Sequence, residues 1–181
     1  MKNRIKTALC VPVLLGMMAA SVLFAQEVKE DAKGQKDALH WSLGLSSEGN
    51  MNVPKGYALG AGLYGLIVFP DWVKTGRFSA GAKLLYSTEF KRYGLFDTAL
   101  LFRWNFYDFS KPRGPDSGFF VQAEGGVSLG WNGKTSNPFV FGLGEAAFGY
   151  RFTVKNFFIE PYIRGGYPVI WAAGISGGLR I

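Results

Sequence analysis

The sequence predicts an all-β protein that folds as an eight-stranded antiparallel up-and-down β-barrel. Apolar residues fall at every second position in segment after segment, which is the period of a β-strand. Turn-rich stretches divide the chain into eight such segments. The 181 residues include 25 Gly, 16 Phe, 8 Tyr and 5 Trp but only 20 Lys or Arg and 13 Asp or Glu residues. The composition is therefore rich in glycine and aromatic residues and poor in charged residues. The mean hydropathy of +0.09 excludes a bundle of membrane helices, each of which would need about 20 consecutive apolar residues.

The N-terminal residues 1–25 have the pattern of a secretory signal peptide. Lys2, Arg4 and Lys6 precede an apolar run over residues 8–24, and a small-residue site ends at Ala25. A retained membrane anchor is the alternative, but Pro12 and Gly16 interrupt the run. Cleavage after Ala25 would also remove Cys10, so the exported chain would have neither a disulfide nor a free thiol.

Removing the signal changes the charge balance. Three of the 20 basic residues leave with it, so the mature chain of 181 − 25 = 156 residues carries 17 − 13 = +4. This bias is too weak to indicate a nucleic-acid partner. Residues 26–37 form a charged tail that we expect to be solvated.

Alternation begins after this tail and continues over residues 38–181. The segments are residues 39–46, 57–64, 78–87, 96–106, 119–131, 139–152, 157–164 and 173–181, with turn-rich stretches at residues 47–55, 70–77, 110–117 and 132–138. In the first four segments one face carries Leu39, Trp41, Leu43 and Leu45; Tyr57, Leu59, Ala61 and Leu63; Phe78, Ala80, Ala82, Leu84 and Tyr86; and Phe96, Thr98, Leu100, Phe102, Trp104 and Phe106.

The last four segments continue the pattern. Their apolar faces carry Phe119, Val121, Ala123, Val127, Leu129 and Trp131; Ala146, Phe148, Tyr150 and Phe152; Phe157, Ile159, Pro161 and Ile163; and Ala173, Ile175, Leu179 and Ile181. The sixth segment is clear only in its second half. Its first half fits either phase, which leaves the register open and allows a bulge there.

Alternation alone does not decide which face is inside. A soluble lipocalin-like barrel would turn its apolar face inward and show water a charged face. Here the polar set instead contains many small residues, which suit the narrow interior of an eight-stranded barrel. Its ten glycines are residues 44, 60, 62, 81, 126, 130, 149, 166, 174 and 178. The apolar set has aromatic residues near the ends of the segments, as expected of the aromatic girdles that border a lipid-facing band. These features favour a transmembrane barrel.

Nine charged residues fall on the inward face and are expected to form a lumen charge network. They are Lys83, Asp97, Arg103, Glu124, Glu145, Arg151, Glu160, Arg164 and Arg180. Because buried charges are tolerated only when paired, most of them should lie within reach of an opposite charge. Neighbouring strands would place Arg103 near Glu124, Glu145 near Arg164, and Glu160 near both Arg151 and Arg180, with the register uncertain by about two residues.

At this point the chain resembles the small eight-stranded outer-membrane β-barrels, such as the OmpA transmembrane domain, OmpX and OmpW. The resemblance is one of architecture and covers the signal peptide and residues 38–181. It implies location in the outer membrane, both termini in the periplasm, contact with outer-membrane lipid, a monomer, and help from periplasmic chaperones and the barrel-assembly machinery. That machinery recognises alternating apolar residues ending in an aromatic; Ile175, Leu179 and Ile181 match the alternation, but Ile181 departs from the terminal aromatic.

The sequence offers little chemistry. His40 and Ser42 form a His-x-Ser pair of the kind used by some outer-membrane lipid-modifying enzymes. However, they begin the first strand, near the periplasmic rim and far from outer-leaflet lipid, so a hydrogen-bonded lumen histidine is favoured. We expect no catalytic or cofactor site. We also expect no metal site, because one His and, after signal cleavage, no Cys leave only carboxylates, which the arginines already require. Glycine strings such as residues 60–62 and 142–144 lie in strands without a following helix, so they are not phosphate loops.

Two non-enzymatic functions remain, with lipid modification as a remote third. The first is a closed barrel with a structural or surface-contact role; its short external connections, near residues 47–55, 88–94, 132–138 and 167–171, do not favour broad adhesion. The second is a narrow conduit for small apolar solutes, as the likeness to OmpW implies. A continuous plug across Glu124, Glu145 and Arg164 would favour the first. An apolar pocket at the outer mouth, lined by residues such as Tyr64 or Phe141, would favour the second.

Overall fold

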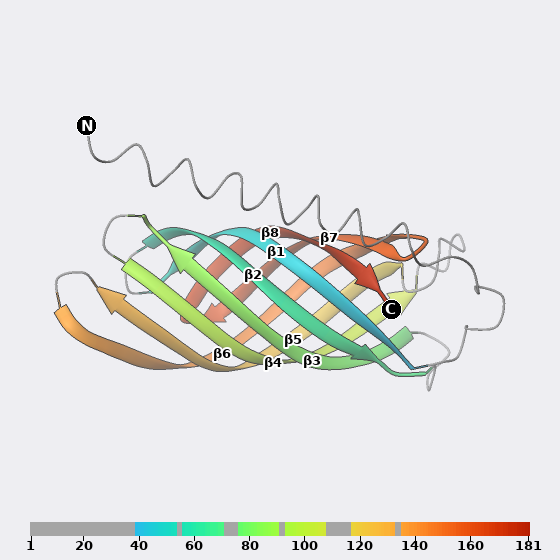
Figure 1. Cartoon of the computed structure of the whole chain (residues 1–181), viewed down its shortest axis with the longest axis horizontal. Helices are drawn as coiled ribbons and strands as arrows, with labels where there is room; N and C mark the ends of the chain where they lie inside the picture. Colours follow the sequence, from blue (N-terminus) through green and yellow to red (C-terminus); the bar gives the residue numbers. More distant parts are fainter. Residues whose placement is uncertain (1–38, 54–55, 71–75, 91–92, 108–116, 133–134) are drawn as a thin grey trace. The chain divides into compact units, whose positions relative to one another are not determined.

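The computed structural model describes residues 39–53, 56–70, 76–90, 93–107, 117–132 and 135–181. The expected signal peptide and the tail of residues 26–37 lie outside this part of the chain. The described residues form a closed antiparallel barrel in which each strand pairs with the next and β8 pairs with β1 (Figure 1). This confirms the predicted fold class. Its strands are β1 (His40–Asn52), β2 (Gly56–Val68), β3 (Gly76–Thr88), β4 (Tyr93–Tyr107), β5 (Gly118–Asn132), β6 (Thr135–Val154), β7 (Phe157–Tyr167) and β8 (Val169–Arg180).

The strands are staggered, and the stagger fixes the width of the lumen. One row of directly opposite residues passes once around the barrel through Asn50, Ala172, Arg164, Ala147, Gln122, Arg103, Ser79, Val68 and His40. The row begins and ends on β1 at positions 50 − 40 = 10 residues apart, so the strands are inclined to the barrel axis. Every residue of this row is buried, as expected for an eight-stranded barrel whose interior is just filled by side chains.

The alternation places polar residues inside and apolar residues outside. On β1, His40, Ser42 and Ser46 are buried, whereas Trp41 and Leu43 are exposed. Strands β3 to β7 also turn charged side chains inward, but the lumen contains apolar side chains as well, such as Leu66 and Phe120. The exposed set includes large aliphatic and aromatic side chains from all eight strands. Among the described residues, no helix is long and apolar enough to cross a membrane.

The sixth strand has one continuous phase from Leu143 to Arg151, with odd-numbered residues facing the lumen. Its register against β5 shifts between Gly130 and Asn132, so the irregularity lies before Phe139, at the start of the strand. The strands are also longer than predicted: β1 reaches Asn52 and β6 begins at Thr135. The Ser, Asn and Gly residues near 47–52 resemble a turn in sequence, but Asn50 and Asn52 are small polar residues that line the lumen.

Several aromatic rings lie inside the barrel, each resting against a glycine of the next strand. Tyr64 lies opposite Gly44, and a Cβ atom at Gly44 would be 2.5 Å from its ring. The same arrangement pairs Phe120 with Gly149 and Phe158 with Gly178. The lumen glycines therefore have a second role besides suiting a narrow interior: they leave space for the aromatic side chains that fill it.

Candidate functional site: the charged lumen

The first cluster of the lumen is centred on Glu160 of β7, which is fully buried. One carboxylate oxygen accepts hydrogen bonds from Arg103 Nη1 at 2.6 Å and from Arg151 Nε. The other accepts from the Tyr64 hydroxyl at 2.6 Å and from Ser176 Oγ at 3.0 Å. Four strands thus converge on one carboxylate through its partners, which satisfies the acceptor capacity of the buried charge.

The two arginines of this cluster also lie against aromatic rings. The Arg103 guanidinium is 4.0 Å from the centre of the Phe120 ring, and that of Arg151 is 4.1 Å from the Phe158 ring. A cation over a ring face is attracted by the ring quadrupole, and more strongly where water is excluded. Each arginine therefore has a carboxylate and a ring as neighbours.

The second cluster joins Arg164 of β7 to two carboxylates. Arg164 donates Nε to Glu48 Oε2 at 2.8 Å and Nη2 to Glu48 Oε1 at 2.6 Å, a bidentate pair, and Nη1 to Glu145. The Tyr162 hydroxyl donates to Glu48 at 2.9 Å, and Asn50 Nδ2 donates to Glu48 at 2.9 Å. Arg164 of β7 thus links β1 and β6 on the lumen side of the wall.

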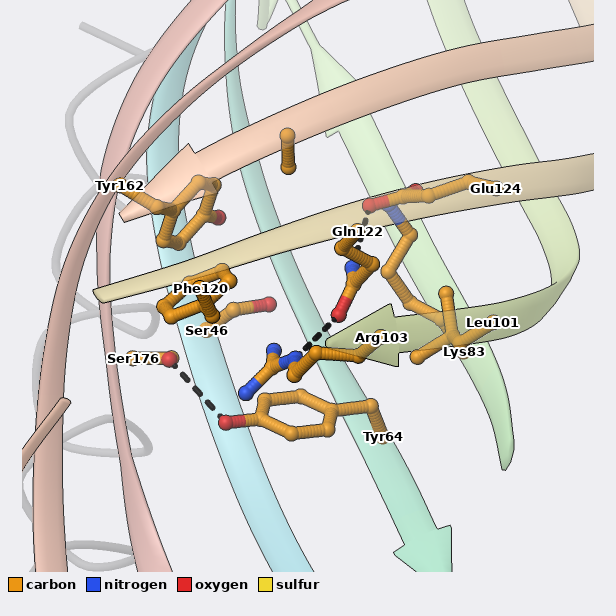
Figure 2. A pocket seen from close by; sticks show the side chains of 11 residues that line it. Ser46, Tyr64, Lys83, Leu101, Arg103, Phe120, Gln122, Glu124, Tyr162 and Ser176 are labelled. Atoms are coloured by element: carbon orange, nitrogen blue, oxygen red, sulfur yellow. Dashed lines mark hydrogen bonds and ion pairs between the residues drawn. The ribbon is translucent and has the colours of Figure 1, made fainter. Parts of the chain in front are cut away.

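Gln122 extends the first cluster to a further ion pair. It accepts from Arg103 Nε at 2.7 Å and donates Nε2 to Glu124 at 2.7 Å, while Glu124 forms an ion pair with Lys83 (Figure 2). Between the clusters lies a cavity of about 20 Å³, bordered by Ser46, Lys83 and Gln122 among others. A volume of this size holds about one water molecule. Side chains therefore fill most of the space at this level.

Seven of the nine predicted network residues form ion pairs in the structure. They are Lys83 with Glu124, Arg103 and Arg151 with Glu160, and Arg164 with Glu145. Among the described residues Asp97 has no ion pair, but its Oδ1 accepts a 2.6 Å hydrogen bond from Ser128. Arg180 is half-buried near the end of β8, and residue 176, not residue 180, lies opposite Glu160.

The predicted partners were right for Glu145 with Arg164 and for Glu160 with Arg151. The predicted proximity of Arg103 to Glu124 needs correction: the register places Arg103 opposite Gln122, and its carboxylate partner is Glu160. Glu160 is then occupied by Arg103 and Arg151, and the expected partner Arg180 is replaced by Ser176. A shift of two residues keeps the lumen face but changes the neighbour, because side chains alternate with a period of two.

Sequence reasoning missed Glu48, the bidentate partner of Arg164. Glu48 lies within residues 47–55, which resemble a turn because of their Ser, Gly and Asn content. The alternation of β1 would have revealed it, since Glu48 has the same parity as the lumen residues Ser42 and Ser46.

The other residues considered in the sequence, namely the His-x-Ser pair and the two candidates for an outer pocket, lie in packed surroundings. His40 and Ser42 are both buried on the lumen side of β1, and the Ser42 hydroxyl accepts a hydrogen bond from Arg151 Nη1 at 3.2 Å. Tyr64 lies in the Glu160 cluster instead of lining an outer pocket, and Phe141 packs against Phe139 with ring centres 5.1 Å apart. Within the described ranges, no group of three or more His, Cys, Asp or Glu residues could hold a metal ion.

The assembly-signal candidates lie on the last strand and the residue after it. Ile175 and Ile181 are exposed on the outer face, and Leu179 is half-exposed there. Ile181 exchanges two backbone hydrogen bonds of 2.9 Å with Trp41, so it joins the last strand to the first.

Compared with known proteins, the chain matches no protein-family model and no curated protein.

Proposed function

We propose that this protein is an integral outer-membrane β-barrel with a closed, ion-paired lumen and a structural or surface-contact role. The observation that carries the proposal is the inverted distribution of polarity: charges are buried in the lumen, and large apolar side chains cover the outside. Soluble monomers rarely expose apolar patches larger than a few hundred Å². A bilayer would bury this apolar surface, and the closed barrel leaves no unpaired strand edge around its belt.

The outer-membrane location is supported by the signal-peptide pattern together with the fold. In Gram-negative-type envelopes, barrels of this kind are inserted by the assembly machinery, and an even strand number puts both termini on the same side. We propose that this side is the periplasm. The hairpins β1–β2, β3–β4, β5–β6 and β7–β8 would then face outward.

The closed role is favoured over the conduit for small apolar solutes. The Arg103 side chain of β4 reaches Glu160 of β7, and the cavity between the clusters has room for about one water. The two residues named for an apolar outer pocket have other contacts: the Tyr64 hydroxyl donates to Glu160, and Phe141 packs against Phe139 with ring centres 5.1 Å apart. Catalysis is not favoured either, since Ser42 is engaged by Arg151.

Two experiments test the proposal. The chain with its signal should fractionate with outer membranes in a Gram-negative host, and the purified barrel should insert into lipid vesicles and run faster on unheated than on heated gels. Recovery in the soluble periplasmic fraction would contradict the membrane assignment. In planar bilayers and liposome-uptake assays the inserted barrel should pass neither ions nor small apolar solutes; sustained uptake of an apolar solute would favour the conduit.

A further inference from the structure

The outer wall of the barrel has a hollow that crosses the last four strands. Its volume is about 660 Å³, which lies within the range of about 300–1,000 Å³ that is typical of small-molecule sites. On the outside it is bordered by six exposed side chains, which are Val121 of β5, Ala146 and Phe148 of β6, Ile163 of β7, and Trp171 and Ala173 of β8. None of the six is charged.

The hollow arises because a row of small residues lies beside a row of larger ones. Ala146 lies opposite Ala123 on one side and Gly165 on the other, so this row has little side-chain volume. The neighbouring outward row holds larger side chains on three of its four strands, in the order Val121, Phe148, Ile163 and Ala173. The larger side chains stand above the small ones and form one side of the hollow.

The hollow runs obliquely along the barrel. Behind it lies a row of lumen residues that includes Ala172 and Gln122. Ala172 is close to the β7–β8 hairpin, whereas Gln122 is close to Gly118, where β5 begins at the opposite end of the barrel. The two ends of the hollow therefore lie at different heights, because the strands are inclined to the barrel axis.

The lining favours an apolar occupant. Arg164 also lies behind the hollow, but its side chain is buried in the lumen and paired with Glu48 and Glu145. A polar or charged occupant would lose its hydration without gaining a partner from the bordering side chains. A hydrocarbon occupant has no such cost.

One end of the hollow has aromatic residues typical of a membrane–water interface. Trp171 lies at this end, and its ring meets the Tyr57 ring edge-on, with ring centres 6.2 Å apart. Trp and Tyr are enriched at the level of lipid headgroups. From Trp171 the hollow continues along the wall toward Val121. A molecule that begins at headgroup level and continues as hydrocarbon matches this path.

A second copy of the barrel fits the hollow less well. The outer wall of a closed barrel is convex, so it would rest on the larger side chains and leave the hollow unfilled. Stable protein–protein interfaces also bury about 1,200–2,000 Å², an area much larger than the six side chains that border this hollow provide. A slender, flexible chain fills the space without these difficulties.

We propose that this hollow binds one acyl chain of an outer-leaflet lipid, which lies along the wall from Trp171 toward Val121. The inference rests on the proposed membrane location, which surrounds the wall with hydrocarbon. It goes beyond general contact with lipid, because it places one chain at one site. A chain in the hollow has protein atoms on more than one side, so it gains more dispersion contacts than a chain against the convex wall.

The test uses the folded barrel in nanodiscs of phosphatidylcholine that carries a photoactivatable group in the middle of one acyl chain. After irradiation, mass spectrometry of peptides locates the labelled residues. Label should be about five-fold or more enriched on the residues that border the hollow, compared with the outward residues of β1, β2 and β3. Even labelling around the wall would overturn the proposal. So would strong dependence on an anionic headgroup in phosphatidylglycerol nanodiscs, because the proposed site recognises the chain.

A pair of alanine variants locates the site. Ala146→Phe fills the hollow with a ring and should lower the labelling of Ile163 and Trp171 about five-fold. Ala82→Phe is the matched control, because Ala82 is an exposed alanine on the outer face of β3, away from the hollow. If Ala146→Phe does not fold, as judged by gel mobility without heating, Ala173→Phe fills the same hollow from β8.

Two further outcomes of these variants would overturn the proposal. The first is unchanged labelling in the filled variant. The second is a wild-type dimer in nanodiscs that the filled variant disrupts, since the hollow would then take a second copy of this chain.

The two proposals fail in distinguishable ways. A barrel that inserts into vesicles but is labelled evenly overturns the acyl-chain site alone. A barrel that is recovered in the soluble periplasmic fraction and does not insert overturns the membrane assignment, and the acyl-chain site with it.

Discussion

Glu160 has hydrogen bonds to four residues, more than any other lumen carboxylate among the described residues. Its surroundings show how a buried charge is compensated in this barrel. Its two oxygens accept four hydrogen bonds, two of them from arginines that lie on aromatic rings. Removing one member of a buried ion pair leaves the other as an uncompensated charge. The stability of the barrel should therefore depend strongly on this single carboxylate.

We expect Glu160→Gln to lower the free energy of unfolding by about 3–5 kcal/mol, because Arg103 and Arg151 would lose their carboxylate. Urea unfolding of the barrel in lipid vesicles measures this loss. Asp97→Asn is the control: it also converts a buried lumen carboxylate to an amide, but Asp97 has no ion pair among the described residues. It should cost less than about 1 kcal/mol. Equal losses in the two variants would contradict the special place of Glu160.

At the scale of strands, glycines determine how closely neighbours approach. A Cβ atom at Gly178 of β8 would collide with the Leu43 carbonyl oxygen of β1 and would lie 2.7 Å from the Phe158 ring. Its neighbour Gly177 faces the other way, and a Cβ there would be 3.5 Å from the Phe158 carbonyl oxygen, an ordinary contact. The seam that closes the barrel therefore depends on one glycine of the pair.

Gly178→Ala should destabilise the barrel by about 1–3 kcal/mol, because the backbone of β1 must move to admit the methyl group. Gly177→Ala should change the free energy of unfolding by no more than about 0.5 kcal/mol. Urea midpoints and the heat-dependent shift in gel mobility give the comparison. If both variants matched wild type, β1 and β8 would pack less closely than the Gly178 geometry indicates.

The end of β8 also bears on assembly. Ile181 is bound to Trp41 through its backbone alone, and its side chain is exposed. Ile181→Phe should therefore leave stability unchanged while supplying the aromatic residue that the proposed assembly signal lacks. We expect a larger folded fraction in the outer membrane of a Gram-negative host, measured by gel mobility of unheated membranes; Ile181→Ala should not give this gain. An unchanged fraction for Ile181→Phe would show that the terminal aromatic is not limiting.

The number of strands follows from the sequence, because alternation is a local property with a fixed period. The direction of their faces follows from the composition of each set, since the polar set is rich in glycine and the apolar set in aromatic residues. Strand ends do not, since Ser, Asn and Gly near Glu48 suit both a turn and a narrow lumen. Partners across the lumen do not follow either. Arg103 contacts Glu160, which is 57 residues away in the sequence, and Lys83 contacts Glu124, which is 41 residues away. Only the stagger of the closed barrel brings these pairs together.

At the scale of the whole molecule, the proposed membrane environment decides what an exposed position tolerates. Leu100 is 73% exposed in the middle of β4, and Val154 is 70% exposed at the last residue of β6. In water, a charge at either position would be nearly neutral. In a bilayer, the cost of a charge on the lipid face depends on depth.

We therefore expect Leu100→Arg to destabilise the barrel in vesicles by about 2–4 kcal/mol and Val154→Arg by about 0–1 kcal/mol. Urea unfolding in vesicles measures both, and the same pair in detergent micelles, whose surface adapts to the charge, should differ less. Because the two side chains are almost equally exposed, burial by protein cannot account for a difference. If Leu100→Arg were as stable as Val154→Arg in vesicles, the middle of the barrel wall would not face hydrocarbon.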